Sequence, residues 1–373
     1  MRNKNFLFFM AALAAFILVV TLNAIPAPKT SVNTYSGSTM SNENTMKPTL
    51  EKFTLDKESL IKFKIAAVTG NTDTSGLKYN QIIVVNKNSE SGFNWPYLLY
   101  IPEKIKKDKA AKILVLPNNT LKPSDNFEDH FNKALADFNL LKPHFDDHII
   151  LMPVFPRFRD KMGGDLIYTH ALDRDAITIS PLDKTDIYRL DLQLVKMIEH
   201  AQVILQAEEN IDINKQVDMF GFSASASFTD RFVFLHPDLV DKIAIGGFNG
   251  ILTLPVDKLG EYQLAYPLGI DDYNEITGYA FDLKKVSSIH RFVFMGSEDT
   301  NDAALYRDAY STEEETKIMN LMGKTPIERI PFLKKIYREY GYNNTVFKTY
   351  QGVGHTITGE MILDIQGFFK ETG

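Results

Sequence analysis

The chain alternates short apolar runs with longer segments of helical spacing, and this alternation most restricts its fold. The runs Lys112–Leu116, His148–Val154 and Val217–Phe222 have the length and apolar content of strands buried on both faces of a sheet. Leu190–Ala207 has amphipathic helical periodicity, and Ala224–Leu235 continues as a helix directly after a strand. Strands separated by helices predict βαβ units, and therefore an α/β fold with a mainly parallel central sheet and helices on both faces.

The same patterns predict further elements along the chain. Strands are expected at Leu60–Val68, Asn80–Asn86, Tyr97–Ile101, Lys242–Ile245, Arg291–Met295 and Thr345–Tyr350, and helices at Phe127–Asn139 and Glu360–Phe369. Two segments interrupt the rhythm. Residues 251–288 contain Gly, Pro and many Tyr without an obvious regular element, and residues 302–340 are mostly helical and charged. Both are candidate cap segments, and ordinary surface packing is the alternative interpretation.

The N-terminus has the features of a targeting segment. Arg2 and Lys4 precede an apolar run from Phe6 to Leu22, so residues 1–24 are expected to be a signal peptide or an N-terminal membrane anchor. Residues 25–48 are rich in Ser, Thr, Asn and Pro and are expected to be a flexible linker. The catalytic domain is then residues 49–373, and the protein is expected to be exported, either secreted or held at the cell surface.

Composition excludes several classes of protein and site. The chain has no cysteine, which excludes disulfides, thiolate catalysis and iron–sulfur clusters. Its net charge of −6 argues against a nucleic-acid partner. The acidic clusters Asp271–Asp272 and Asp173–Asp175 lack the spacing of calcium loops, so no metal site is expected. No glycine-rich phosphate loop is present and no cofactor is expected, and contact with a membrane is expected only through the N-terminal segment, if it is uncleaved.

The central motif is the run Val217–Ser225, in which an apolar strand leads into Gly221-Phe222-Ser223-Ala224-Ser225 and then into a helix. It resembles the nucleophile elbow of the α/β-hydrolase superfamily, and the closest likeness is to bacterial secreted carboxylesterases and lipases. The resemblance implies the α/β-hydrolase fold with a cap or lid insertion, and Ser223 as nucleophile. Ser225 stands where relatives usually have a second Gly, and a serine that merely caps the helix is the alternative for Ser223.

The resemblance also implies an order along the chain of serine, then acid, then histidine. Asp299 follows Gly296 at the end of the strand Arg291–Met295, where these enzymes place the acid, and Glu298 and Asp302 are its rivals. His355 follows the final strand in the run Gly352-Val353-Gly354-His355. The other histidines precede Ser223, end the helix after it, or precede a strand. In the implied mechanism, His355 takes the proton of Ser223, and Asp299 orients the imidazole ring.

An oxyanion hole and a substrate site are also expected. One oxyanion donor should be the N–H of Ala224, and the second should come from the loop at Asn118 or Asn119, which lacks the His-Gly of many relatives. Arg157, Phe222 and Tyr266 are candidate substrate-binding residues, although a structural salt bridge is an equal interpretation of Arg157.

The resemblance implies hydrolysis of small-molecule or polymeric carboxylic esters through an acyl-enzyme. A peptidase or a thioesterase would use the same three residues, because substrate choice depends on the walls of the cleft. A non-catalytic cell-surface binding protein on the same scaffold is the alternative from another class. A fluorophosphonate probe would label Ser223 of an enzyme and leave a binding protein unlabelled.

Overall fold

The computed structural model describes residues 77, 79–105, 110–119, 122–159, 167–178, 186–209, 211–306 and 310–371. The predicted targeting segment 1–24, the predicted linker 25–48 and the predicted strand Leu60–Val68 lie outside these residues. None of the described helices combines the length and hydropathy that a membrane crossing requires.

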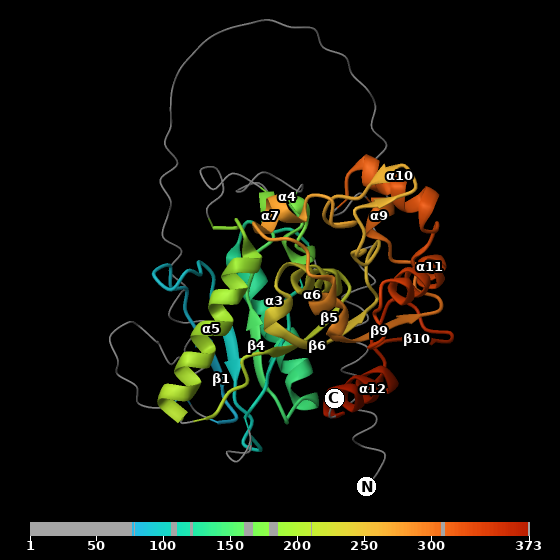
Figure 1. Cartoon of the computed structure of the whole chain (residues 1–373). Helices are drawn as coiled ribbons and strands as arrows, with labels where there is room; N and C mark the ends of the chain where they lie inside the picture. Colours follow the sequence, from blue (N-terminus) through green and yellow to red (C-terminus); the bar gives the residue numbers. More distant parts are fainter. Residues whose placement is uncertain are drawn as a thin grey trace, which may run out of the picture.

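The described residues form a central sheet of eight strands in the order β1-β2-β4-β3-β5-β6-β9-β10 (Figure 1). β1 and β2 pair antiparallel, as do β2 and β4, and the other neighbours are parallel. The prediction of a mainly parallel sheet is therefore confirmed. The strands are β1 (Ile82–Val85), β2 (Tyr97–Tyr100), β3 (Ile113–Val115), β4 (Ile149–Pro153), β5 (Val217–Phe222), β6 (Val240–Gly246), β9 (His290–Gly296) and β10 (Thr345–Tyr350).

Helices follow most strands and cover the sheet. The α-helices are α3 (Phe127–Leu141), α4 (Arg174–Thr178), α5 (Leu190–Glu209), α6 (Ala224–Leu235), α7 (Tyr273–Thr277), α8 (Leu283–Ser288), α9 (Ala303–Tyr306), α10 (Thr312–Leu321), α11 (Pro326–Glu339) and α12 (Gly359–Lys370). Short 3-10 helices occupy Lys142–His144, Thr169–Ala171 and Pro237–Leu239.

Both faces of the sheet are covered, as β5 shows. The ring of Phe220 lies 5.9 Å from that of Phe145, just after α3, and Phe145 lies 6.2 Å from Phe369 of α12. The next residue, Gly221, packs instead against the backbone of α6. Consecutive strand residues point to opposite faces, so α3 and α12 cover one face and α6 the other. Helix α5 lies beside α6, since Asp191 of α5 contacts His236, which follows α6, at 2.8 Å.

The central strands are buried and the last strand is less so. Every residue of β3, β4 and β5 is buried, which explains why these strands appear in the sequence as nearly continuous apolar runs. Strand β10 at the edge of the sheet is buried only at Tyr350. All residues of α6 are buried as well, so the helix after Ser223 is enclosed by the rest of the molecule.

The segment 251–288, for which no regular element was expected, contains four. A two-stranded hairpin joins β7 (Lys258–Leu259) to β8 (Tyr262–Gln263), and α7 and α8 follow it. These elements have two to six residues, too few to show a helical or strand period. The second candidate cap segment, 302–340, is helical as expected where described: α11 lies next to β9 and β10, and α9 and α10 lie above it in the view of Figure 1. The role of either segment as a cap stays a prediction.

Candidate active site

Ser223 lies in a sharp turn between β5 and α6. Its backbone has φ 63° and ψ −130°, a conformation that a residue with a side chain adopts only under strain. The turn brings strand and helix very close together, since a Cβ on Gly221 would lie 2.2 Å from the backbone oxygen of Ser225. The Ser223 N–H donates to the carbonyl of Gly246 on β6 at 3.0 Å. The Ser223 side chain does not cap α6, so the helix-capping interpretation does not describe it.

The structure brings Ser223, His355 and Asp299 together at the carboxyl end of the parallel strands. His355 Nε2 lies 2.9 Å from Ser223 Oγ, and His355 Nδ1 lies 2.8 Å and 3.0 Å from the two carboxylate oxygens of Asp299. A carboxylate only accepts hydrogen bonds, so Nδ1 carries the proton of the neutral ring and Nε2 is left to accept the Ser223 hydroxyl. The side chain of Asp299 is 1% exposed and that of His355 is 12% exposed.

The two rivals of Asp299 have other surroundings. Glu298 is exposed. Asp302 is buried and forms a two-bond ion pair with Arg329, with both N–O distances 2.8 Å. The loop that carries His355 crosses the end of β9 closely, because a Cβ on Gly296 would lie 2.1 Å from the carbonyl oxygen of Val353. This close approach at a glycine lets the last loop reach back over the sheet edge.

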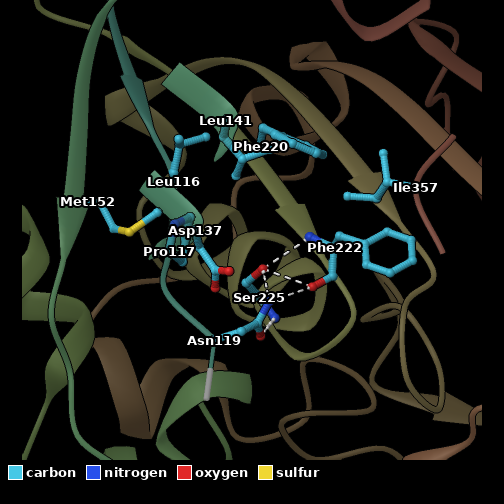
Figure 2. A pocket seen from close by; sticks show the side chains of 10 residues that line it. All are labelled: Leu116, Pro117, Asn119, Asp137, Leu141, Met152, Phe220, Phe222, Ser225 and Ile357. Atoms are coloured by element: carbon cyan, nitrogen blue, oxygen red, sulfur yellow. Dashed lines mark hydrogen bonds between the residues drawn. The ribbon is translucent and has the colours of Figure 1, made fainter. Parts of the chain in front are cut away.

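Asn119 holds the turn around Ser223 in place. Its Nδ2 donates to the carbonyl of Phe222 at 2.9 Å and to Ser225 Oγ at 3.1 Å, and its Oδ1 accepts from the Ser225 N–H at 3.0 Å (Figure 2). Ser225 Oγ in turn bonds both the N–H and the carbonyl of Phe222. The serine that replaces the usual glycine therefore fits the turn and adds hydrogen bonds to it.

The two asparagines of the predicted oxyanion loop have different surroundings. The Asn118 side chain bonds both the carbonyl and the N–H of Phe155 at 2.9 Å and 3.0 Å. Its Nδ2 also lies 3.3 Å from His170, and burial lowers the pKa of His170 to about 3. Asn119 lies against the turn, and Ala224 is the first residue of α6, so its N–H has no acceptor within the helix.

A small cavity lies beside the turn, on the face covered by α3 and α12. Figure 2 shows Phe222, Ser225 and Asn119 on one side of it and Asp137 of α3 on another, and burial raises the pKa of Asp137. Ser223 is not among the residues that line it. The full lining is Leu116, Pro117, Asn119, Asp137, Leu141, Met152, Phe220, Phe222, Ser225 and Ile357.

The three candidate substrate-binding residues are all buried. The ring of Phe222 lies 4.9 Å from that of His355, so Phe222 supports the imidazole. The guanidinium of Arg157 stacks on the ring of Tyr168 at 3.7 Å. The Tyr266 hydroxyl donates to the carbonyl of Leu172, and its N–H donates to Asp272 at 2.7 Å. These contacts lie within the protein, and a role for the three residues in substrate binding stays a prediction.

The sequence interpretation missed two residues that adjoin Ser223 and His355. Asn249, just after β6, places its Nδ2 3.4 Å from Ser223 Oγ. Asn301, two residues after Asp299, places its Nδ2 3.2 Å from His355 Nε2 and 2.6 Å from Asn249 Oδ1. Both follow parallel strands at their carboxyl ends, which is where α/β proteins assemble their sites, and that position was the available signal. Within the described part of the chain, no group of His, Cys, Asp and Glu is arranged to hold a metal ion.

Comparison with models of protein families gave no match, and neither did comparison with curated protein sequences. Solved structures do resemble the chain. Poly(aspartic acid) hydrolase-1 from Sphingomonas sp. KT-1 matches with a TM-score of 0.52 at 16% identity, over 79% of this chain and 99% of that one. A CE1 ferulic acid esterase from Anaeromyces mucronatus matches with a TM-score of 0.42 at 13% identity, over 81% and 93%. The sheet order, the turn at Ser223 and the likeness to the first of these structures show that the chain has the α/β-hydrolase fold.

Proposed function

We propose that this protein is a serine hydrolase that cleaves carboxylic esters through an acyl-enzyme intermediate. The observation that carries the proposal is the continuous chain of hydrogen bonds from Asp299 through His355 to Ser223, with distances of 2.8 Å and 2.9 Å. A serine hydroxyl is a weak nucleophile unless a base removes its proton, and a base is most effective when a third group orients it. The three residues supply these three roles in the order expected from the sequence.

The roles follow from the positions of the protons. His355 Nε2 accepts the Ser223 proton as Oγ attacks the ester carbonyl, and Asp299 stabilises the resulting imidazolium. The proton then passes from Nε2 to the leaving alcohol, and the acyl group stays on Oγ. A water molecule then repeats these steps. It loses a proton to Nε2 and attacks the acyl carbon, which releases the acid, and Nε2 returns the proton to Oγ.

The oxyanion that forms during each attack needs hydrogen-bond donors. We assign the N–H of Ala224 as one donor, because it begins α6 beside the nucleophile. We assign the backbone N–H of Asn119 as the second, because its side chain ties this loop to Ser225 and Phe222. The Asn118 side chain is engaged with Phe155 and is not assigned to this role.

The proposed substrate is a small-molecule or polymeric ester, and residues 1–24 are proposed to export the protein. An esterase is named among the similar structures, and so is a hydrolase of poly(aspartic acid). Fractionation of cells that produce the full chain, compared with a chain lacking residues 1–24, tests the proposed export.

The test of activity uses p-nitrophenyl esters of graded acyl length with the wild type and with Ser223→Ala. We expect the wild type to release p-nitrophenol and Ser223→Ala to lose at least about 10³-fold in kcat, because the acyl-enzyme cannot form. A fluorophosphonate probe should label the wild type at Ser223 and fail to label the variant. Circular dichroism shows whether the variant is folded. Equal hydrolysis rates for the two proteins, or label on another residue, would exclude the proposal.

A further inference from the structure

Asn249 and Asn301 surround the two reacting atoms on the side of β6 and β9. Asn249 Nδ2 approaches Ser223 Oγ, Asn301 Nδ2 approaches His355 Nε2, and the two amides bond each other at 2.6 Å. Together with the 2.9 Å contact between Ser223 and His355, these contacts form a closed ring. The oxyanion donors assigned above come from α6 and the β3 loop, on the other side of β5, so the two amides are not needed for that task.

A buried arginine holds this pair of amides in place. Arg329 of α11, fully buried, donates to the carbonyl of Gly250, next to Asn249, at 2.8 Å, and pairs with Asp302, next to Asn301. The Asn301 N–H also donates to Asp299 at 3.0 Å, which ties it to the acid. One guanidinium therefore connects the two loops that carry the amides.

The two amides retain unused hydrogen-bonding capacity next to Ser223 and His355. Among the described residues, Asn301 Oδ1 has no hydrogen-bond partner, and Asn249 Nδ2 has only the long contact of 3.4 Å with Ser223. An amide offers an acceptor and donors together, which matches a hydroxyl group. The leaving oxygen must come within hydrogen-bond reach of Nε2 to receive its proton, so the rest of the leaving alcohol passes these atoms.

We propose that Asn249 and Asn301 form a leaving-group subsite that selects esters whose alcohol carries a second hydroxyl group, such as glycol or polyol esters. This inference rests on the proposed ester hydrolysis. The second hydroxyl donates to Asn301 Oδ1 and accepts from Asn249 Nδ2 while the first bond breaks: the C–O bond of the ester opens, the acyl carbon stays on Ser223 Oγ, and Nε2 gives its proton to the departing oxygen. A plain alkyl alcohol would leave these amide atoms without partners.

The experiment compares two esters of one acid, the 2-hydroxyethyl ester and the propyl ester, which have the same number of heavy atoms and differ in one hydroxyl. The acyl group is the one that the wild type prefers among p-nitrophenyl esters. We expect kcat/KM of the wild type to favour the 2-hydroxyethyl ester by about tenfold or more. Asn301→Leu and Asn249→Leu should reduce that ratio to near one. If the leucine variants fold poorly, Asn301→Ser replaces them in the same comparison.

Asn343→Leu is the matched control, because Asn343 is exposed in the turn before β10 and should retain the wild-type ratio. A wild-type ratio near one would overturn the subsite. So would variants that slow both esters by the same factor, since the amides would then only support Ser223 and His355. A wild type that hydrolyses no ester would instead overturn the proposed function itself.

Discussion

At the scale of single residues, the strained backbone of Ser223 depends on the absence of a side chain two positions earlier. Ser223 has a positive φ, and strand and helix approach each other at Gly221. This strained conformation places the Ser223 hydroxyl beyond the edge of the sheet, where Oγ lies 2.9 Å from His355 Nε2. The hydrogen bonds of Asn119 and Ser225 offset part of that strain by holding the turn from both sides.

Gly221→Ala should therefore damage both stability and activity. The new methyl group would meet the backbone of α6 at 2.2 Å, and backbone atoms there cannot move aside without displacing Ser223. We expect a loss of about 1–3 kcal/mol in the free energy of unfolding, measured with urea, and at least a tenfold fall in kcat/KM.

Gly367→Ala in α12 is the control for this substitution, since its Cβ would meet nothing within 4 Å. Alanine in place of glycine within a helix should leave stability unchanged or raise it by about 0.5–1 kcal/mol. A Gly221→Ala enzyme with wild-type stability and kcat/KM would show that the close approach at this turn is not required.

At the scale of elements, α11 connects the segment 302–340 to the loops that carry the site. Arg329 lies inside the helix and reaches Asp302 after β9, Gly250 after β6, and Gly323 before its own helix. A buried ion pair contributes little net stability compared with apolar residues, but removal of one partner leaves a charge in the interior. We interpret Arg329 as a clamp that sets the relative positions of the two loops that carry Asn249 and Asn301.

Arg329→Met should lower the free energy of unfolding by about 3–5 kcal/mol, because the carboxylate of Asp302 would be buried without its counter-charge. The double variant Arg329→Met with Asp302→Leu should lose less than the single variant, which urea unfolding would measure. Lys335→Met, on the same helix, removes the exposed pair with Glu339 and should stay within about 1 kcal/mol of the wild type. Equal losses for the single and double variants would contradict the clamp.

At the scale of the whole molecule, buried titratable groups contribute to the change of stability with pH. Burial lowers the pKa of His170 to about 3, and the same effect raises the pKa of Asp173 and of Asp230 to about 6. His170 is neutral in the folded protein but binds a proton below about pH 6.5 when unfolded. Its contribution to the free energy of unfolding is therefore complete above pH 6.5 and is lost as the pH falls. The two aspartates act in the opposite direction between about pH 4 and pH 6.

His170→Gln should remove one of these opposing effects. We expect the stability of the wild type relative to this variant to fall by about 2 kcal/mol between pH 7.5 and pH 5, because the unfolded imidazole is protonated there and the folded one is not. Urea unfolding of both proteins at several pH values measures this difference. The contributions of the two aspartates cancel in it, because both proteins contain them. A difference that does not change with pH would show that His170 titrates normally in the folded protein.

Local patterns in the sequence were sufficient for the framework of the fold. The ends of β5, α6 and β10 agree with the expected ranges, because apolar runs and helical spacing are properties of neighbouring residues. The motif around Ser223 and the glycine-rich loop before His355 also indicated where the chain turns. Asp299, expected from its place after a strand, is the acid that the structure brings to His355.

Only the tertiary structure decided which polar groups meet at the sheet edge. Asn119 bonds Ser225 across 106 residues, and Asn249 meets Asn301 across 52. The short elements of 251–288 likewise depend on packing against the rest of the molecule. Such contacts leave no periodic pattern, because they arise between segments that the folding of the sheet brings together. The sequence by itself determined the strands of the central sheet, the turn at Ser223 and the order of Ser223, Asp299 and His355, while the hydrogen bonds that surround these residues exist only once the sheet has formed.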